Sequence, residues 1–263
     1  HFPLAMAALK AGKHVLVTKP IASSSAQARR MIDAAKKRRL TLMVDHTFVY
    51  TGAVRKMREL VKAGELGEIL YYDSTRINLG LFQRDVNVIW DLAVHDLSIM
   101  NHLLAAKPSA VSATGVSHLP KAQENTAYLT LFFPGRMIGH IHASWLSPVK
   151  IRRTLLGGSK KMVVYDDLEN SEKVKVYDSG ITVSKKPRDI YQMLIGYRAG
   201  DMLAPRLDVA EGLKVELRHF VDCVKTGKRP LTDGVAGLRT LLLLEAASRS
   251  IKRRGFPEEP SRV

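Results

Sequence analysis

Lys19 has the residue type and the position of a group that could act on a substrate. It closes the segment His14-Val-Leu-Val-Thr-Lys-Pro20, whose apolar part predicts a short strand over 14–17. Ligands of α/β sheets bind beyond the carboxyl ends of parallel strands. A lysine there can orient a substrate hydroxyl and help to move its proton. The alternative interpretation is an ordinary surface lysine in a loop.

Asp91 and His95 form a second candidate pair, in Trp90-Asp-Leu-Ala-Val-His-Asp96. A spacing of four residues puts both side chains on one face of a helix. A carboxylate beside an imidazole holds its tautomer and raises its pKa, which suits a general base near neutral pH. The alternative is an acidic residue at a helix N-terminus beside a partly buried histidine.

Other common catalytic motifs are absent from the sequence. His140 and His142 lie two apart on a predicted strand, but no cysteine or carboxylate cluster accompanies them. We therefore expect no metal site. The sequence contains no G-x-S-x-G, P-loop or zinc-ligand spacing.

Composition limits the class of protein. The 263 residues are 46% hydrophobic and 25% charged, as in globular domains. No run approaches the ~18 apolar residues of a membrane helix, so we expect no membrane association. The net charge is +16, but the basic runs lie at the ends of predicted elements, so we expect no nucleic-acid partner. The single cysteine, Cys223, excludes an internal disulfide and fits a reducing cytoplasm.

The hydrophobic pattern divides the chain near residue 50. Up to that point predicted helices alternate with short strands, which is typical of a parallel α/β sheet. Beyond it, longer strands separated by turns predict one open, mostly antiparallel sheet. The predicted helices cover 3–11, 23–38, 54–63, 91–104, 208–225 and 233–252. The predicted strands cover 14–17, 40–44, 69–79, 108–116, 126–133, 137–145, 152–156, 162–165 and 173–177.

The expected fold is thus α/β plus α+β. Residues 1–50 would form the tail of a doubly wound Rossmann domain. Residues 51–263 would form a large-sheet domain with helices on one face, and the last helices would pack back on the first part. A sheet of this size has a second face to cover, so we expect a homodimer or homotetramer through it.

Several motifs together resemble one family. The segment Ala7-Ala-Leu-Lys-Ala-Gly-Lys-His-Val-Leu-Val-Thr-Lys-Pro-Ile-Ala22 resembles the glucose–fructose oxidoreductase, inositol dehydrogenase and rhizopine-catabolism (Gfo/Idh/MocA) family. That family usually has Glu where Thr18 stands. The resemblance continues through Gly64-Glu-Leu-Gly-Glu-Ile69 and the Asp-x-x-x-His of Asp91 and His95, and it reaches Phe220–Pro230 and Thr232–Gly237 near the C-terminus.

The resemblance implies NAD or NADP as cofactor and hydride transfer at a sugar or polyol carbon. It puts Lys19 at the nicotinamide and the substrate hydroxyl, with His95 as acid/base and Asp91 as its partner. Pro20 and Gln83 would contact the cofactor. We expect Lys19 and His95 to meet in one cleft.

The Gly-rich dinucleotide loop is absent from this sequence, and we expect it upstream of His1. Without that loop, this stretch of chain by itself is expected to be inactive. The choice between NAD and NADP is normally made in the same upstream part.

Three stretches, 76–90, 163–172 and 197–201, resemble family members that act on nucleotide-diphosphate amino sugars. This resemblance implies a substrate site that contains Asn78, His95, Tyr197, Arg198 and Arg206. Arg76, Arg198 and Arg206 would suit a diphosphate, and surface arginines are the equal alternative. A free-sugar or inositol dehydrogenase, or a non-catalytic sugar-binding or scaffold protein, remain open alternatives. The sequence leaves the sugar and its ring carbon open.

Overall fold

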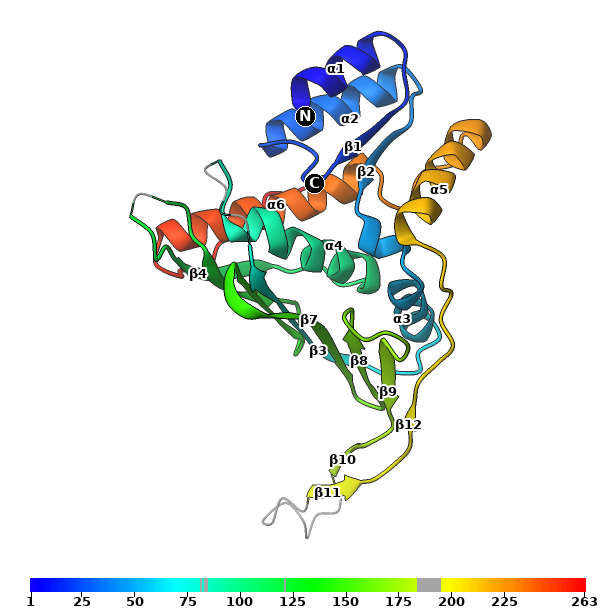
Figure 1. Cartoon of the computed structure of the whole chain (residues 1–263), viewed down its shortest axis with the longest axis vertical. Coiled ribbons are helices and arrows are strands. Elements are labelled where there is room, and N and C mark those ends of the chain that lie inside the picture. The colour runs from blue at the N-terminus through cyan, green and yellow to red at the C-terminus, as the bar shows by residue number, and fades with distance from the viewer. Residues whose placement is uncertain (81, 83–84, 121, 184–194) are drawn as a thin grey trace.

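The first part of the chain is a small parallel sheet flanked by helices. The structure is a computed structural model that describes residues 1–263 except residues 81, 83, 84, 121 and 184–194. Strands β1 (Val15–Thr18) and β2 (Leu42–Asp45) pair in parallel. Helices α1 (Phe2–Lys10) and α2 (Ser25–Lys37) pack beside them (Figure 1). The predicted alternation of helix and strand is confirmed, with ends that differ by a few residues.

The second part is an eight-stranded sheet in the order β12-β9-β8-β7-β3-β6-β5-β4. Neighbouring strands are antiparallel except β3 and β6, which run parallel. The predicted open, mostly antiparallel sheet is therefore confirmed. Its strands are β3 (Ile69–Leu79), β4 (Ala110–Val116), β5 (Thr126–Phe132), β6 (Ile138–Ser144), β7 (Leu146–Gly158), β8 (Met162–Asp166), β9 (Val174–Tyr177) and β12 (Met202–Leu203).

Helices cover one face of this sheet (Figure 1). Helix α6 (Gly234–Lys252) packs on β4, on α4 (Val94–Leu103) and on α2, so it joins the two sheets. Helix α3 (Gly52–Lys62) packs against α4, and α5 (Gly212–Thr226) against the short 3-10 helix η1 (Thr47–Tyr50). Along β5 the residues alternate between the buried core and the opposite, uncovered face.

The structure departs from the sequence prediction in several places. Strand β7 begins at Leu146, before the predicted strand 152–156, and neither η1 nor β12 was predicted. The predicted helix 91–104 begins instead with a π-helical turn, η2 (Ile89–Ala93), which leads into α4. The hairpin of β10 (Gly180–Val183) and β11 (Ile195–Arg198) was not predicted, because its short strands carry little hydrophobic alternation. No helix in the described ranges is long and apolar enough to cross a membrane.

Candidate active site

Lys19 lies directly after β1, at the carboxyl edge of the parallel pair. Its ammonium Nζ donates to the main-chain oxygen of Asp91 at 2.7 Å and approaches Asp91 Oδ1 at 3.3 Å. Both side chains are about a quarter exposed, so the pair is open to a ligand. Thr18 does not take part, because its Oγ1 lies 3.1 Å from Nε2 of His1. The contact ties the small parallel sheet to the turn that packs on β6 and β3, two inner strands of the large sheet.

Asp91 lies in the π-helical turn η2, a type of turn that is frequent at functional sites. Its second carboxylate oxygen, Oδ2, accepts a hydrogen bond from Nε1 of Trp145 at 3.0 Å. The Trp145 ring is buried, and it lies between the ends of β6 and β7. Each Asp91 oxygen thus has a separate partner, which holds the carboxylate against the lysine.

Gly80 is the residue that lets Trp145 take this position. A Cβ atom at position 80 would lie 2.3 Å from Cδ1 of the Trp145 ring, a distance that real side chains do not tolerate. The backbone N–H of Gly80 also donates to the main-chain oxygen of Trp145 at 3.0 Å. A glycine is therefore required after β3 if the indole is to reach Asp91.

The expected pairing of Asp91 with His95 is wrong. The Asp91 carboxylate contacts Lys19 and Trp145, and no contact with His95 is found in the described part of the chain. The physical reason is the π-helical turn, which has more residues per turn than an α-helix. This changes the angle about the helix axis between residues 91 and 95, so their side chains do not share one face as they would on a regular α-helix.

The expected rise in the pKa of His95 is also wrong. Burial lowers the pKa of His95 well below 6.5, and the cations Arg76, Lys19 and Arg152 and the ring of His46 lower it further. The imidazole is consequently neutral at pH 7. The residue remains partly exposed, while its Nδ1 is buried and has no hydrogen-bond partner among the described residues. A neutral ring beside a lysine can accept a proton from a substrate.

Phe48, which sequence analysis did not single out, holds His95 in place. The two rings are in edge-to-face contact, with their centroids 5.0 Å apart. The guanidinium of Arg76 lies 4.5 Å from the centre of the Phe48 ring. Phe48 belongs to η1, which follows β2. Its position shortly after a parallel strand was the only feature of the sequence that could have indicated its role.

The predicted role of Arg76 at a diphosphate is wrong for a related reason. Its side chain is only 4% exposed and binds the buried carboxylate of Asp96 through two bonds, Nε–Oδ2 at 2.7 Å and Nη2–Oδ1 at 3.2 Å. Both of these bonds are made within the core. Arg76 therefore supports Phe48 and α4 and does not face a ligand.

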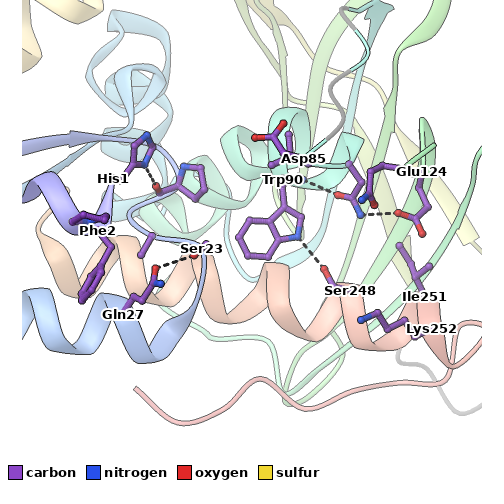
Figure 2. A pocket seen from close by; sticks show the side chains of 16 residues that line it. His1, Phe2, Ser23, Gln27, Asp85, Trp90, Glu124, Ser248, Ile251 and Lys252 are labelled. Carbon is purple, nitrogen blue, oxygen red and sulfur yellow. Dashed lines mark hydrogen bonds between the residues drawn. The ribbon is translucent and has the colours of Figure 1, made fainter. Parts of the chain in front are cut away.

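A cavity of about 520 Å³ opens between α1, α2, η2 and α6. Figure 2 shows Phe2 and Gln27 on one side, Trp90 in the middle and Ser248 on α6 opposite. The indole of Trp90 donates to Oγ of Ser248 at 2.9 Å. Pro20 and Trp90, the sequence neighbours of Lys19 and Asp91, belong to its lining. Lys19, Asp91 and His95 are not among its lining residues.

The remaining predicted substrate residues are not gathered at Lys19. Tyr197 and Arg198 lie on β11, at the opposite end of the molecule from β1 (Figure 1). Arg198 binds the side chain of Asp178 and donates to the main-chain oxygen of Lys160 at 2.7 Å. Arg206 is exposed on the segment between β12 and α5. These three residues do not join Lys19 within one chain, because the long sheet separates them.

Asn78 and Gln83 are the remaining two predicted positions. Asn78 is partly buried near the end of that strand, two residues before Gly80. Gln83 lies outside the described residues.

His140 and His142 lie on the uncovered face of the sheet, where His142 stacks on Tyr128 with ring centres 4.3 Å apart. Within the described ranges, no group of three or more metal-ligating side chains is present.

Comparison with known proteins identifies the family. The model of the oxidoreductase family with an NAD-binding Rossmann fold matches residues 1–46, and that of the GFO/IDH/MocA C-terminal domain matches residues 54–164. The UDP-N-acetylglucosamine 3-dehydrogenase of Acidithiobacillus ferrooxidans is 30% identical over 246 residues, which are 92% of this chain and 72% of that protein. The chain belongs to the GFO/IDH/MocA family. A nicotinamide dinucleotide is this family's cofactor, as expected from the sequence.

Other relatives agree on the class of reaction and the fold. The myo-inositol 2-dehydrogenase of Thermotoga maritima is 25% identical over 97% of this chain and 75% of its own length. The solved structure of the Acidithiobacillus ferrooxidans enzyme superimposes with a TM-score of 0.80 at 24% identity, over 97% of this chain and 76% of that one. This GFO/IDH/MocA protein therefore belongs among NAD-binding oxidoreductases of sugars and polyols.

Proposed function

We propose that this protein moves a hydride between NAD(P) and a ring hydroxyl of a sugar, with a nucleotide-diphosphate amino sugar as its substrate. The observation that supports this most is the Lys19–Asp91 contact beside a neutral, partly exposed His95, at the carboxyl edge of β1.

We place the division between the cofactor part and the substrate part at residue 50. A lone cysteine requires no oxidising compartment, so we place the activity in the cytoplasm.

Each residue of the site has a separate task in this proposal. The Lys19 ammonium donates to the substrate hydroxyl and stabilises the negative charge that develops on its oxygen. Asp91 holds that ammonium in place through its main-chain and side-chain oxygens. His95 is neutral at pH 7, so it can take the hydroxyl proton.

The cavity of Figure 2, lined by the sequence neighbours of Lys19 and Asp91, fits the nicotinamide end of the cofactor. The ring needs apolar surfaces, which Phe2, Pro20 and Trp90 supply, and its carboxamide needs polar partners such as Gln27. A volume of about 520 Å³ is within the usual range for small-molecule sites. When bound, the nicotinamide supplies the hydride acceptor. The described residues lining the cavity include no Gly-rich loop for a pyrophosphate.

The substrate class is tested by steady-state oxidation of UDP-N-acetylglucosamine, of free N-acetylglucosamine and of myo-inositol, each with NAD and with NADP. The relative of 30% identity is a UDP-N-acetylglucosamine 3-dehydrogenase, and this favours the first of the three. A higher kcat/KM for the nucleotide sugar supports the proposal. A higher kcat/KM for myo-inositol would instead assign the protein to the activity of its Thermotoga relative. Turnover of none of them would favour a sugar-binding protein without catalysis.

We also propose that two copies associate through the uncovered face of the large sheet. Tyr128, Phe132, Ile138 and Val149 are exposed on its strands, and each is between 38% and 64% accessible. Several exposed apolar side chains on one face of a sheet favour an interface there. Light scattering should give at least a dimer, and Tyr128→Asp should shift it toward the monomer. A monomeric wild type at micromolar concentration would contradict this part.

A further inference from the structure

A second cavity, of about 230 Å³, lies between η1, α3, α4 and α6. It shares no lining residue with the cavity of Figure 2. Its walls carry Arg58 and Lys62 from α3, His102 from α4 and Arg239 from α6, with His46 on its inner side. These residues were not assigned any function from the sequence.

The charge around this cavity is positive and uncompensated. None of the residues that line it is acidic, and all of them are described. Arg239 and Lys62 have no ion pair with any described residue, and Arg58 donates one hydrogen bond, to the main-chain oxygen of Leu103. Cations that converge without a carboxylate repel one another, and a bound anion would relieve this repulsion.

The titration of the neighbouring groups agrees with this geometry. Burial lowers the pKa of His102 to about 4, and the charges of Arg58 and Lys62 contribute. Burial and the charges of Arg239 and Arg58 also lower the pKa of Lys107, which places another cation close by.

His46 supplies an independent indication of a ligand. The residue is 3% exposed, and both ring nitrogens are buried without a hydrogen-bond partner in the described part of the chain. Its backbone is fixed, because the N–H donates to Oε1 of the buried Glu216 at 3.0 Å. A buried donor left without a partner costs about 1–3 kcal/mol, so a native protein normally satisfies it with a ligand or water.

The size and the remaining polar groups limit the ligand. A volume of about 230 Å³ corresponds to roughly seven water molecules at about 30 Å³ each, which holds one tetrahedral anion and some water. It is below the usual range for a drug-sized ligand. The hydroxyls of Ser98, Thr232 and Thr240 and the amide of Asn101 complete the lining. Arginine nitrogens and hydroxyls are the usual partners of phosphate oxygens.

We propose that this cavity binds a phosphate-type oxyanion through Arg58, Arg239 and Lys62, with His46 as an inner hydrogen-bond donor. The site is separate from the one at which a sugar would be oxidised, and it does not depend on that activity. His46 also lies close enough to Lys19 and His95 for their charges to influence one another.

Titration calorimetry with inorganic phosphate at constant ionic strength, with chloride as the reference salt, tests the proposal. Arg239→Gln should weaken phosphate binding about tenfold or more, the usual value of a hydrogen bond to a charged group. Lys62→Gln lies on an exposed position of α3 and should weaken it by a smaller factor without disturbing the fold. The control is Lys36→Gln, which removes one charge from another basic groove and should leave binding unchanged.

Ring signals of His46 in a histidine NMR spectrum, assigned by their loss in His46→Gln, should shift as phosphate is added. A parallel titration with glycerol 3-phosphate distinguishes the source of the anion. Tighter binding of the ester indicates the phosphoryl group of a metabolite, and tighter binding of phosphate indicates the free ion. Unchanged His46 signals, or equal binding by wild type and Arg239→Gln, would overturn the proposal.

Discussion

Lys19 and Asp91 are 72 positions apart in the chain, yet Nζ of the lysine lies 2.7 Å from the main-chain oxygen of Asp91 and 3.3 Å from its Oδ1. The lysine ends a strand of the parallel sheet, and the aspartate lies in the turn that opens α4. The contact thus depends on how the two parts of the molecule pack. It is the feature on which the proposed chemistry rests.

The first prediction concerns this pair. Lys19→Met should lower kcat for sugar oxidation by about 10²–10⁴-fold, the typical effect of a positioned proton-transfer or charge-stabilising group. Asp91→Asn should have a smaller effect, because the main-chain oxygen still accepts from Lys19. Steady-state kinetics measure both. Lys56→Met, in the exposed pair with Glu59, is the control and should retain full activity.

The second prediction concerns His95. Because the pKa of His95 is lowered well below 6.5, the ring stays unprotonated as the pH falls through 6.5. The acid limb of kcat/KM should therefore lie below pH 6.5 in the wild type. His95→Asn should lower kcat by about 10²–10⁴-fold and should remove that limb.

Cofactor affinity, followed by fluorescence, should change little in His95→Asn. His14→Asn, at an exposed histidine before β1, is the matched control. A His95→Asn variant with near wild-type kcat would show that another residue takes the proton.

The third prediction concerns Gly80. Gly80→Ala places a methyl group against the Trp145 ring, so the indole should lose its hydrogen bond to Asp91. We expect lower kcat and lower thermal stability. In a Trp145→Phe background, which already lacks the indole N–H, Gly80→Ala should lower kcat much less. Additive effects on kcat in this double-mutant cycle would mean that Gly80 does not act through Trp145.

The fourth prediction concerns the buried Glu216. Burial and the neighbouring Asp45 carboxylate raise the pKa of Glu216 to about 8 from its ordinary 4.5. A raised pKa contributes stability that is fully present below pH 4.5 and is lost as the pH rises through 8. Glu216→Gln keeps the acceptor for His46 N–H and has no charge to bury.

The variant should therefore be more stable than wild type at pH 8, by at least about 1 kcal/mol, and should lose this advantage near pH 4.5. Urea unfolding at several pH values measures the difference. Glu59→Gln, at an exposed glutamate, should show no such dependence. A stability difference independent of pH would mean that the pKa of Glu216 is not raised in the folded protein.

The sequence by itself determined the elements and the place of Lys19 and His95 on them. Hydrophobic periodicity is a local property, and it was sufficient to predict β1, β2, α4, α6 and the large open sheet. Lys19 follows β1 and His95 opens α4, close to the predicted positions. The order of the motifs along the chain was also sufficient to indicate the family.

Only the tertiary structure decided which partners these residues have and how they titrate. The π-helical turn directs Asp91 away from His95, and Trp145 reaches Asp91 from 54 positions away because Gly80 leaves room for its ring. Burial among Arg76, Lys19 and Arg152 lowers the pKa of His95, although the neighbouring sequence suggested a rise. Such contacts and desolvation depend on packing between segments far apart in the chain, which local patterns of residue type do not encode.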